Sequence, residues 1–306
     1  MSTTRDLIAL LAIKGIGPAK AKGILEGLNI KKTSGASFLP RVPDLFPAGN
    51  INMSDIGDVS QYADEVLKNA KQKKIRIITH LDKKYPEALR YISNAPLVLY
   101  YKGDISSLNL KPSIAVVGTR FASAEGLKIA GDSARQAVKD GFVVVSGLAA
   151  GCDTAAHKAT LAEKGITIAV VAHGPDLVFP KENKCLAEDI LKNKGAILSE
   201  YPPGVGAERH HFVQRDRIQS GLSSGVFIVE SDIEGGAMYT AEFALQQRRV
   251  LGCWVFKNAS KVNCSGNQQL LHEKRATPVA SEMAFKNFLV ECKKQKIKKT
   301  EELFGW

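Results

Sequence analysis

The sequence has few cysteines, and nothing in their spacing suggests a use for them. Five cysteines occur in 306 residues, and no two of them form a C-x-x-C pair. An odd count with irregular spacing argues against a disulfide framework or a zinc site and fits a reducing compartment. No run of 18 or more apolar residues occurs, so the sequence predicts no membrane-spanning helix. No basic segment followed by an apolar stretch opens the chain, and we therefore expect a cytoplasmic protein.

The motifs of cofactor binding and catalysis are missing as well. The G-x-G-x-x-G fingerprint is absent, and no acidic residue is well placed for a ribose hydroxyl, which disfavours NAD binding. No Ser–His–Asp arrangement can be placed, nor a pair of carboxylates on one helical face near a pocket. We therefore expect no cofactor, no metal and no enzymatic activity.

Positive charge is in excess, and it is unevenly distributed. The formal net charge is +11, with a pI of about 9.3, which favours a polyanionic partner. Residues 1–70 carry 8 basic and 7 acidic groups, whereas residues 71–256 carry 24 and 19, and residues 257–306 carry 10 and 5. The excess therefore belongs to the larger part of the chain and to its basic tail at 293–299.

The first 70 residues predict a small helical domain. Apolar residues over 7–11 and a helical pattern over 19–28 flank the glycine-containing turn Lys14–Pro18, which is typical of a helix-hairpin-helix or SAM-like unit. The backbone N–H groups of such a turn can contact a DNA phosphate. A plain helical corner that docks another protein is an equal alternative.

Residues 71–306 predict a Rossmann-like α/β domain. From residue 112 onward, apolar runs of four to seven residues alternate with helical patterns. This alternation predicts a doubly wound, mainly parallel sheet with right-handed connections. Strands are expected at 75–79, 114–117, 142–146, 166–172, 196–199, 226–230 and 250–255, and helices at 59–71, 123–139, 153–163, 183–192, 212–220 and 240–248.

The ends of the first two regular strands indicate an anion site. One strand is followed by Gly118-Thr119-Arg120, with Ser123 opening the next helix, and the other ends in Ser146-Gly147. Ligands of doubly wound sheets bind beyond the carboxyl ends of the strands. Glycine lets the backbone approach a ligand closely, and helix N-termini carry partial positive charge. We therefore expect these turns to form a cradle for phosphate.

Later strand ends complete an ordered series of motifs over residues 75–280. The segments are Phe179–Asn183, Ser199–Gly204, Phe212–Ser223 and Glu230–Ala241. The series resembles the DNA-processing protein A family (DprA, also called Smf). Its pattern reads roughly V-G-T/S-R-x-x-S, S-G-L-A-x-G-I-D-x-x-A-H, Y-P-x-x-N, S-E-Y-P-P-G, F-x-x-R-N-R-I-I-x-G-L-S and E-x-x-x-x-S-G-S-x-x-T-A.

This resemblance implies a protein that binds and protects single-stranded DNA. Family members form homodimers and load a RecA-type recombinase onto incoming DNA during natural transformation. The implied partners are therefore single-stranded DNA, a recombinase and a second copy of the chain. The residues expected to hold the DNA backbone are Gly118, Thr119, Arg120, Ser123, Ser146, Gly147, Lys181, Asn183, Arg209, Arg215, Arg217, Gly235, Gly236 and Thr240.

The chain departs from the family pattern at several positions. Asp216 replaces the usual Asn between the two arginines, and Glu234 lies in a segment that replaces the S-G-S context. Both would add negative charge near the expected pocket. Phe179 replaces Tyr and Cys152 replaces Ile.

The two arginines on either side of Asp216 are expected to point in different directions. Arg215 and Arg217 lie two residues apart on an expected helix, so they do not share a face. One is expected to face the DNA groove. The other is expected to brace the loop or a carboxylate such as Glu200 or Glu230.

A nucleotide-processing enzyme is the alternative interpretation. The segment Glu234–Glu242 is similar to the P-G-G-x-G-T-x-x-E motif of nucleoside-monophosphate phosphoribohydrolases, although its proline is missing. In that case Glu242 and Arg217 would act on the N-glycosidic bond. A third interpretation is a nucleotide sensor that uses the same pocket without turnover.

Overall fold

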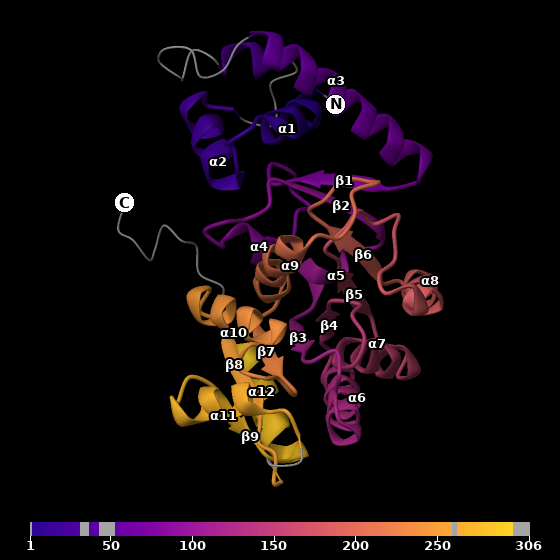
Figure 1. The fold of residues 1–306 in the computed structure, drawn as a ribbon, viewed down its shortest axis with the longest axis vertical. Coiled ribbons are helices and arrows are strands. Elements are labelled where there is room, and N and C mark those ends of the chain that lie inside the picture. Colours follow the sequence, from indigo (N-terminus) through magenta and orange to yellow (C-terminus); the bar gives the residue numbers. More distant parts are fainter. Residues whose placement is uncertain (1, 31–36, 43–52, 259–261, 296–306) are drawn as a thin grey trace.

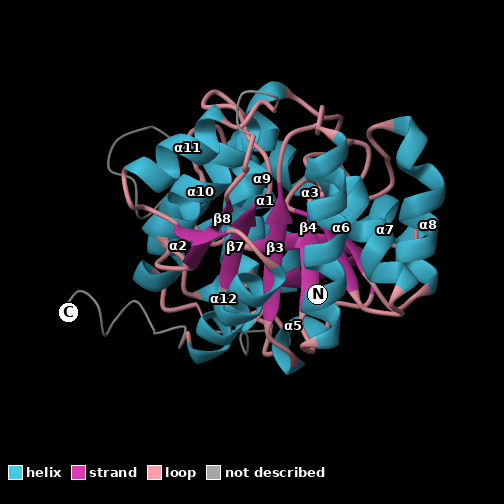
Figure 2. Cartoon of the chain, turned by 90° about the horizontal axis from the view of Figure 1, so that it is seen from below, coloured by secondary structure: helices cyan, strands magenta, loops and turns pink. Residues whose placement is uncertain are grey.

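A computed structural model describes residues 2–30, 37–42, 53–258 and 262–295. The described strands form one nine-stranded sheet in the order β1-β2-β6-β5-β4-β3-β7-β8-β9, with helices on both of its faces (Figures 1 and 2). The strands are β1 Arg76–Thr79, β2 Val98–Gly103, β3 Ser113–Val117, β4 Val143–Ser146, β5 Thr167–Val170, β6 Ala196–Ser199, β7 Gly225–Ile228, β8 Val250–Trp254 and β9 Thr277–Val279.

The helices alternate with the strands along most of the chain. They are α1 Ser2–Ala12, α2 Pro18–Gly27, α3 Met53–Gln72, α4 Glu87–Arg90, α5 Ser107–Leu110, α6 Ala124–Lys139, α7 Cys152–Ala162, α8 Lys184–Lys192, α9 Arg209–Leu222, α10 Gly236–Gln246, α11 Ser265–His272 and α12 Glu282–Lys294, with short 3-10 turns at Leu39–Arg41 and Lys181–Asn183. No helix of the described residues is both long and apolar enough to cross a membrane.

The topology is that of a doubly wound sheet, as the sequence predicts. Strands β3 to β9 pair in parallel, whereas β1 and β2 add an antiparallel edge. The chain runs outward from β3 through β4 and β5 to β6 and then returns to β7, on the opposite side of β3. Strand order therefore reverses at β3, and the carboxyl end of β3 is where such folds bind ligands.

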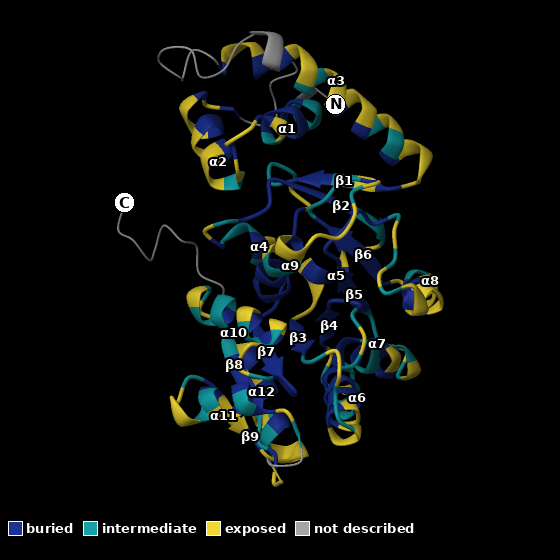
Figure 3. Ribbon diagram, viewed as in Figure 1, coloured by how far each residue is buried: buried dark blue, intermediate teal, exposed yellow. Residues whose placement is uncertain are grey.

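The central strands are buried on both faces, which explains their continuous apolar runs (Figure 3). In β3, Ile114 and Val116 belong to a core cluster with residues of α6, α7 and α12. The alternate residues Ala115 and Val117 belong to a cluster on the opposite face, with residues of α10. Because both faces are filled, the site can form only at the strand ends.

The two expected N-terminal helices are present as α1 and α2, joined by a turn in which Gly15 has a φ of +83°. The apolar residues of α1, α2 and α3 share one cluster with Leu97, Val98 and Tyr100 of the β2 region. Figure 1 shows these helices over the β1–β2 edge. The division at residue 70 and the DNA role of the hairpin stay predictions.

The observed elements differ from the expected ones mainly outside the regular core. Strands β2 and β9 and helices α4, α5, α11 and α12 were not predicted, and α9 and α10 begin three and four residues earlier than expected. Of the basic tail, Lys293 and Lys294 end α12, whereas residues 296–299 lie outside the described residues.

Candidate nucleic-acid interface

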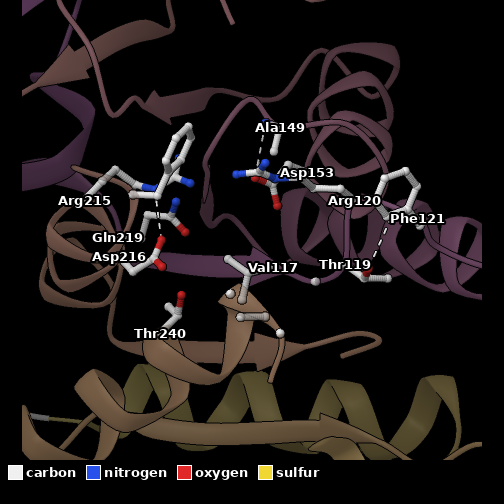
Figure 4. A pocket seen from close by; sticks show the side chains of 15 residues that line it. Val117, Thr119, Arg120, Phe121, Ala149, Asp153, Arg215, Asp216, Gln219 and Thr240 are labelled. Carbon is white, nitrogen blue, oxygen red and sulfur yellow. Dashed lines mark hydrogen bonds and ion pairs between the residues drawn. The ribbon is translucent and has the colours of Figure 1, made fainter. Parts of the chain in front are cut away.

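A cavity of about 220 Å³ lies at the carboxyl end of β3, at the topological switch point (Figure 4). It is walled by the loop after β3, the first turn of α10, one side of α9 and part of the loop before α7. The lining residues are Val117, Gly118, Thr119, Arg120, Phe121, Ala149, Asp153, Phe212, Arg215, Asp216, Gln219, Gly235, Gly236, Ala237 and Thr240. Seven of the residues expected to hold DNA are among them.

Close backbone packing positions the loop that carries Arg120. Gly151 has a φ of +73°, and a Cβ there would lie 2.3 Å from the Thr119 carbonyl oxygen. A side chain at this position would therefore push the loop away. Within the loop, the Thr119 N–H donates to the Glu230 carbonyl at 2.7 Å. The route of the backbone past Arg120 is thus fixed by neighbouring main chain.

Arg120 is the available cation of the cavity. Its side chain is exposed, and its guanidinium lies 4.7 Å from the centre of the Phe212 ring, a distance typical of cation–π contacts. Among the described residues, Arg120 makes no side-chain hydrogen bond or ion pair. Its N–H donors therefore remain available to a phosphate oxygen. The Phe212 ring holds the Arg120 guanidinium at the rim of the cavity.

The N-terminus of α10 supplies a second feature that favours anions. Gly235 is the N-cap, no side chain caps the helix, and the first turn contains no acidic residue. A Cβ at Gly236 would meet nothing within 4 Å, so this turn is open. The N–H of Met238 donates to the Gly235 carbonyl, whereas those of Gly236 and Ala237 have no partner among the described residues. Both residues line the cavity, so the positive end of the helix faces it. Thr240, one turn later, is buried and lines the same wall.

The turn after β4 differs from our expectation. The N–H groups of Gly147 and Ala149 donate to the Asp153 carboxylate at 3.0 and 3.3 Å. The chain therefore supplies its own anion at the place where we expected a phosphate. Burial raises the pKa of Asp153, while the charge of Arg215 and these hydrogen bonds oppose the shift. This turn is a closed structural unit, and Gly147 lines only a neighbouring cavity.

The two arginines of α9 separate as their spacing predicts. Arg215 lines the cavity and donates from Nη1 to the carbonyls of Gly147 and Val170, at 2.8 and 2.7 Å. Arg217 is buried away from the cavity and donates from Nη2 to both oxygens of Glu200, at 2.7 and 2.8 Å. Arg217 therefore braces a carboxylate, and Arg215 ties the ends of two strands to the cavity wall.

Asp216 brings a carboxyl group into the cavity wall. It accepts from Arg215 Nε at 2.9 Å and is almost fully buried. Burial raises its pKa to about 7, although Arg215 lowers it. The charge of the cavity therefore changes near neutral pH, which the Asn of the family pattern would prevent.

The remaining expected residues do not line this cavity. Ser123 caps α6 and donates to Glu230 at 2.7 Å, and Ser146 donates to the Val116 carbonyl at 2.7 Å. Asn183 donates to the Leu148 carbonyl at 2.8 Å. These three side chains hold the surrounding loops. Lys181 and Arg209 are exposed but contribute to neither this cavity nor its neighbour.

An aromatic cavity of about 140 Å³ adjoins the first. Arg120, Phe121, Ala149, Phe212 and Arg215 line both cavities, and Phe179 and His173 line only the second. Phe121 is 91% exposed and Phe179 is 50% exposed, unusual values for phenylalanine. We did not select Phe121 or Gln219 from the sequence. The position of Phe121 beside Arg120 was the one available signal.

The residues of the enzymatic alternative are engaged elsewhere. Glu242 accepts two hydrogen bonds of 2.6 Å from Arg275, and Arg217 pairs with Glu200. Glu230 accepts from Ser123. None of these carboxylates lines the cavity, so they do not converge on a reacting bond.

Comparison with known families agrees with this geometry. The family model described as DNA recombination-mediator protein A matches residues 76–289, which contain the whole sheet and the cavity. The chain belongs to this family. Among curated members, DNA processing protein DprA of Streptococcus pneumoniae is 43% identical over 169 residues, covering 55% of this chain and 59% of that protein. Protein Smf of Synechocystis sp. is 40% identical over 249 residues, covering 79% and 62%. The chain thus spans about three fifths of these relatives.

Two solved structures of family members resemble the fold. DNA processing protein A from Streptococcus pneumoniae superposes with a TM-score of 0.78 at 32% identity, covering 94% of this chain and 98% of that one. DNA processing protein A from Helicobacter pylori gives 0.64 at 26% identity, covering 71% and 96%. The report on the latter describes a single-stranded DNA binding mode for that protein.

Proposed function

We propose that this protein binds single-stranded DNA at the carboxyl end of β3, without catalysis. The phosphate backbone lies across the cavity, against Arg120 and the first turn of α10. Family membership and the binding mode described for the Helicobacter pylori relative support the choice of ligand. The net charge of +11 supports a polyanion of some length over a single nucleotide.

One observation carries the proposal. The free guanidinium of Arg120 and the uncapped N-terminus of α10 lie on the same cavity, and glycines keep the approach open. Two such groups suit two phosphate oxygens or neighbouring phosphates of one strand. Phosphate contacts carry little sequence information, so weak sequence preference is expected.

Exposed aromatic side chains favour a single strand over a duplex. Phe121 and Phe212 line both the phosphate cavity and the adjoining aromatic cavity, and Phe179 lines the aromatic cavity. Unpaired bases stack on such rings, and each stack contributes about 1–3 kcal/mol. A duplex hides these base faces, so the proposal includes a preference for single strands.

Titration of single- and double-stranded oligonucleotides at several salt concentrations tests the proposal. We expect Arg120→Ala to weaken single-strand binding about tenfold, or ~1.4 kcal/mol, on every sequence. Loss of one neutralised phosphate should also reduce the log–log salt slope by about 0.7.

Lys111 provides a matched control. It is an exposed cation at the opposite end of β3, two residues before the strand begins. Lys111→Ala removes the same charge and should leave both the affinity and the salt slope nearly unchanged. Equal effects of the two substitutions would mean that binding follows net charge alone, and the assigned site would be wrong.

The wider role is also a proposal. We infer a cytoplasmic homodimer that protects single-stranded DNA and assists a RecA-type recombinase in DNA uptake, by analogy with the family. Mass measurement of the free protein tests the dimer. Strand-exchange assays with a recombinase test the loading step separately from DNA binding.

A further inference from the structure

Three side chains with metal-binding chemistry meet at the first turn of α9. They are Glu208, His210 and His211, the first of which is the N-cap of the helix. One nitrogen of each imidazole and a carboxylate oxygen of Glu208 all lie within 4.8 Å of one another. The His210 and Glu208 side chains are about two-thirds exposed, whereas His211 is buried.

Helix capping explains only two of these residues. The Glu208 carboxylate accepts from the His211 backbone N–H, and the His211 ring accepts from the Glu208 N–H at 3.3 Å, which forms a capping box. This motif needs no third residue. His210 nevertheless lies against the pair, with its ring centre 4.3 Å from that of His211 and its Nδ1 3.5 Å from Glu208 Oε2.

The His211 ring is oriented in the way that metal-binding histidines commonly are. It stacks on Tyr201 with ring centres 3.9 Å apart. Both of its hydrogen bonds among the described residues involve Nδ1, and the shorter one, 3.1 Å, joins Nδ1 to the Gly206 carbonyl oxygen. The two hydrogen bonds of Nδ1 are therefore alternatives: with the proton on Nδ1, the ring donates to the Gly206 carbonyl and gives up the bond that it accepts from the Glu208 N–H, and Nε2 presents its lone pair. The backbone then fixes the ring of a potential ligand.

The spacing of the three groups suits a small divalent ion. Tetrahedral zinc with bonds of about 2.0–2.1 Å places its ligand atoms roughly 3.3–3.4 Å apart. The 3.5 Å separation of His210 Nδ1 and Glu208 Oε2 already matches that value. Wider separations, up to 4.8 Å, involve exposed side chains that can rotate.

We propose that Glu208, His210 and His211 bind one Zn²⁺ ion, with the fourth position open to solvent. Two imidazoles and one carboxylate favour zinc and neighbouring transition metals over Mg²⁺ or Ca²⁺, which prefer oxygen ligands. The carboxylate charge offsets the positive end of α9. Our expectation of no metal rested on the cysteines, and this site uses none of them.

The site is distinct from the proposed DNA contact, although Phe212 follows it directly in the chain. A bound ion would tie the N-cap to the first turn of α9 and so stabilise the start of this helix. Zinc binding is therefore tested without DNA, and its failure would leave the proposed DNA site untouched.

Isothermal titration of the tag-free, chelator-treated full chain with ZnCl₂ is the experiment. All variants carry Cys185→Ser, which removes the exposed thiol as a competing ligand. We expect one ion per chain with a micromolar Kd and a rise in melting temperature with zinc. His210→Ala and Glu208→Gln should each weaken zinc binding by about 10–100-fold.

His272→Ala is the matched control, because His272 is exposed on α11 and belongs to no such cluster among the residues that the structure describes. It should leave zinc affinity unchanged. NMR signals of the imidazole protons provide a second readout, in which zinc should shift His210 and His211 and spare His272. Absence of stoichiometric binding, or equal loss in the His210 and His272 variants, would overturn the proposal.

Discussion

Two glycine turns lie on the same edge of the sheet, one between β4 and α7 and one between β7 and α10. Both precede a helix. We expected an anion site at the first turn from its glycine and the following helix, and at the second from the family resemblance. In the first, the amides of Gly147 and Ala149 already bind the Asp153 carboxylate. In the second, no side chain caps α10, and Gly235 and Gly236 line an open cavity.

The difference between the turns comes from one acidic residue in the first helical turn. Helix α7 has Asp153 there, and α10 has none. A carboxylate of the chain itself is held at very high effective concentration, so it excludes an external phosphate. A glycine turn at a helix N-terminus is therefore available to a ligand only where the chain supplies no anion of its own.

The largest effect is expected when the closed turn is opened. Asp153→Ala removes the acceptor of two backbone N–H groups and leaves Arg215 beside an empty space. We expect a loss of about 2–4 kcal/mol in the free energy of unfolding, measured by urea denaturation. Asp153→Asn, which keeps one acceptor oxygen, should lose about half as much.

Small carboxylates should partly rescue the opened turn. Formate fits the space left by the Asp153 side chain and can accept from the same N–H groups. It should raise the melting temperature of the Asp153→Ala variant and leave the wild type unaffected at equal ionic strength. Identical responses of the two proteins would show that the turn does not hold its carboxylate as an anion.

A smaller effect is expected when the open turn is closed. Gly236→Asp places a carboxylate at the first position of α10, where a Cβ meets nothing within 4 Å. The new charge suits the helix end, so stability should hold or rise. Single-strand affinity should fall about tenfold through repulsion of the phosphate, or ~1.4 kcal/mol, in a fluorescence anisotropy titration.

The uncharged variant Gly236→Ala separates charge from bulk. Its methyl group enters the same open space and brings no charge, so affinity should change less than about threefold. If alanine weakens binding as much as aspartate does, the turn is sterically tight and its positive end plays no part.

The two turns also show which features of the structure can be predicted from the sequence. Strand β3 was predictable because every residue from Ile114 to Val117 is buried, which leaves a continuous apolar run. The separation of Arg215 from Arg217 followed from helical geometry alone. Helix α12 was readable too, because its buried residues at 285, 288, 289 and 292 have helical spacing, although we did not use it.

The hydrogen-bond partners of side chains at the strand ends could not be predicted from the sequence. The pairing of Gly147 with Asp153 depends on the path of a loop that contains Leu148 at a positive φ of 59°. No local pattern encodes that path. Motif order places Lys181 and Arg209 near strand ends, but it gives neither their distance from the cavity nor the direction of their side chains. The site therefore lies at the predicted edge of the sheet, but the residues that line it differ in part from those expected.

The smallest expected effect is a pH dependence of DNA affinity, and it comes from Asp216, whose carboxyl group lines the open cavity. Asp216 has a pKa of about 7 in the folded protein, above its ordinary value of 3.8, because it is buried. The folded state therefore favours the protonated carboxyl, and its contribution to stability is complete below pH 4 and lost as the pH rises through 7. The same deprotonation makes the cavity less positive.

Single-strand affinity should be about two- to fivefold higher at pH 6 than at pH 8, and Asp216→Asn should remove the part of this dependence that belongs to Asp216. Anisotropy titrations of both proteins at the two pH values, at constant ionic strength, measure it. Unaltered pH dependence in the asparagine variant would assign the titration to another group, such as a histidine, and leave Asp216 as a neutral part of the wall.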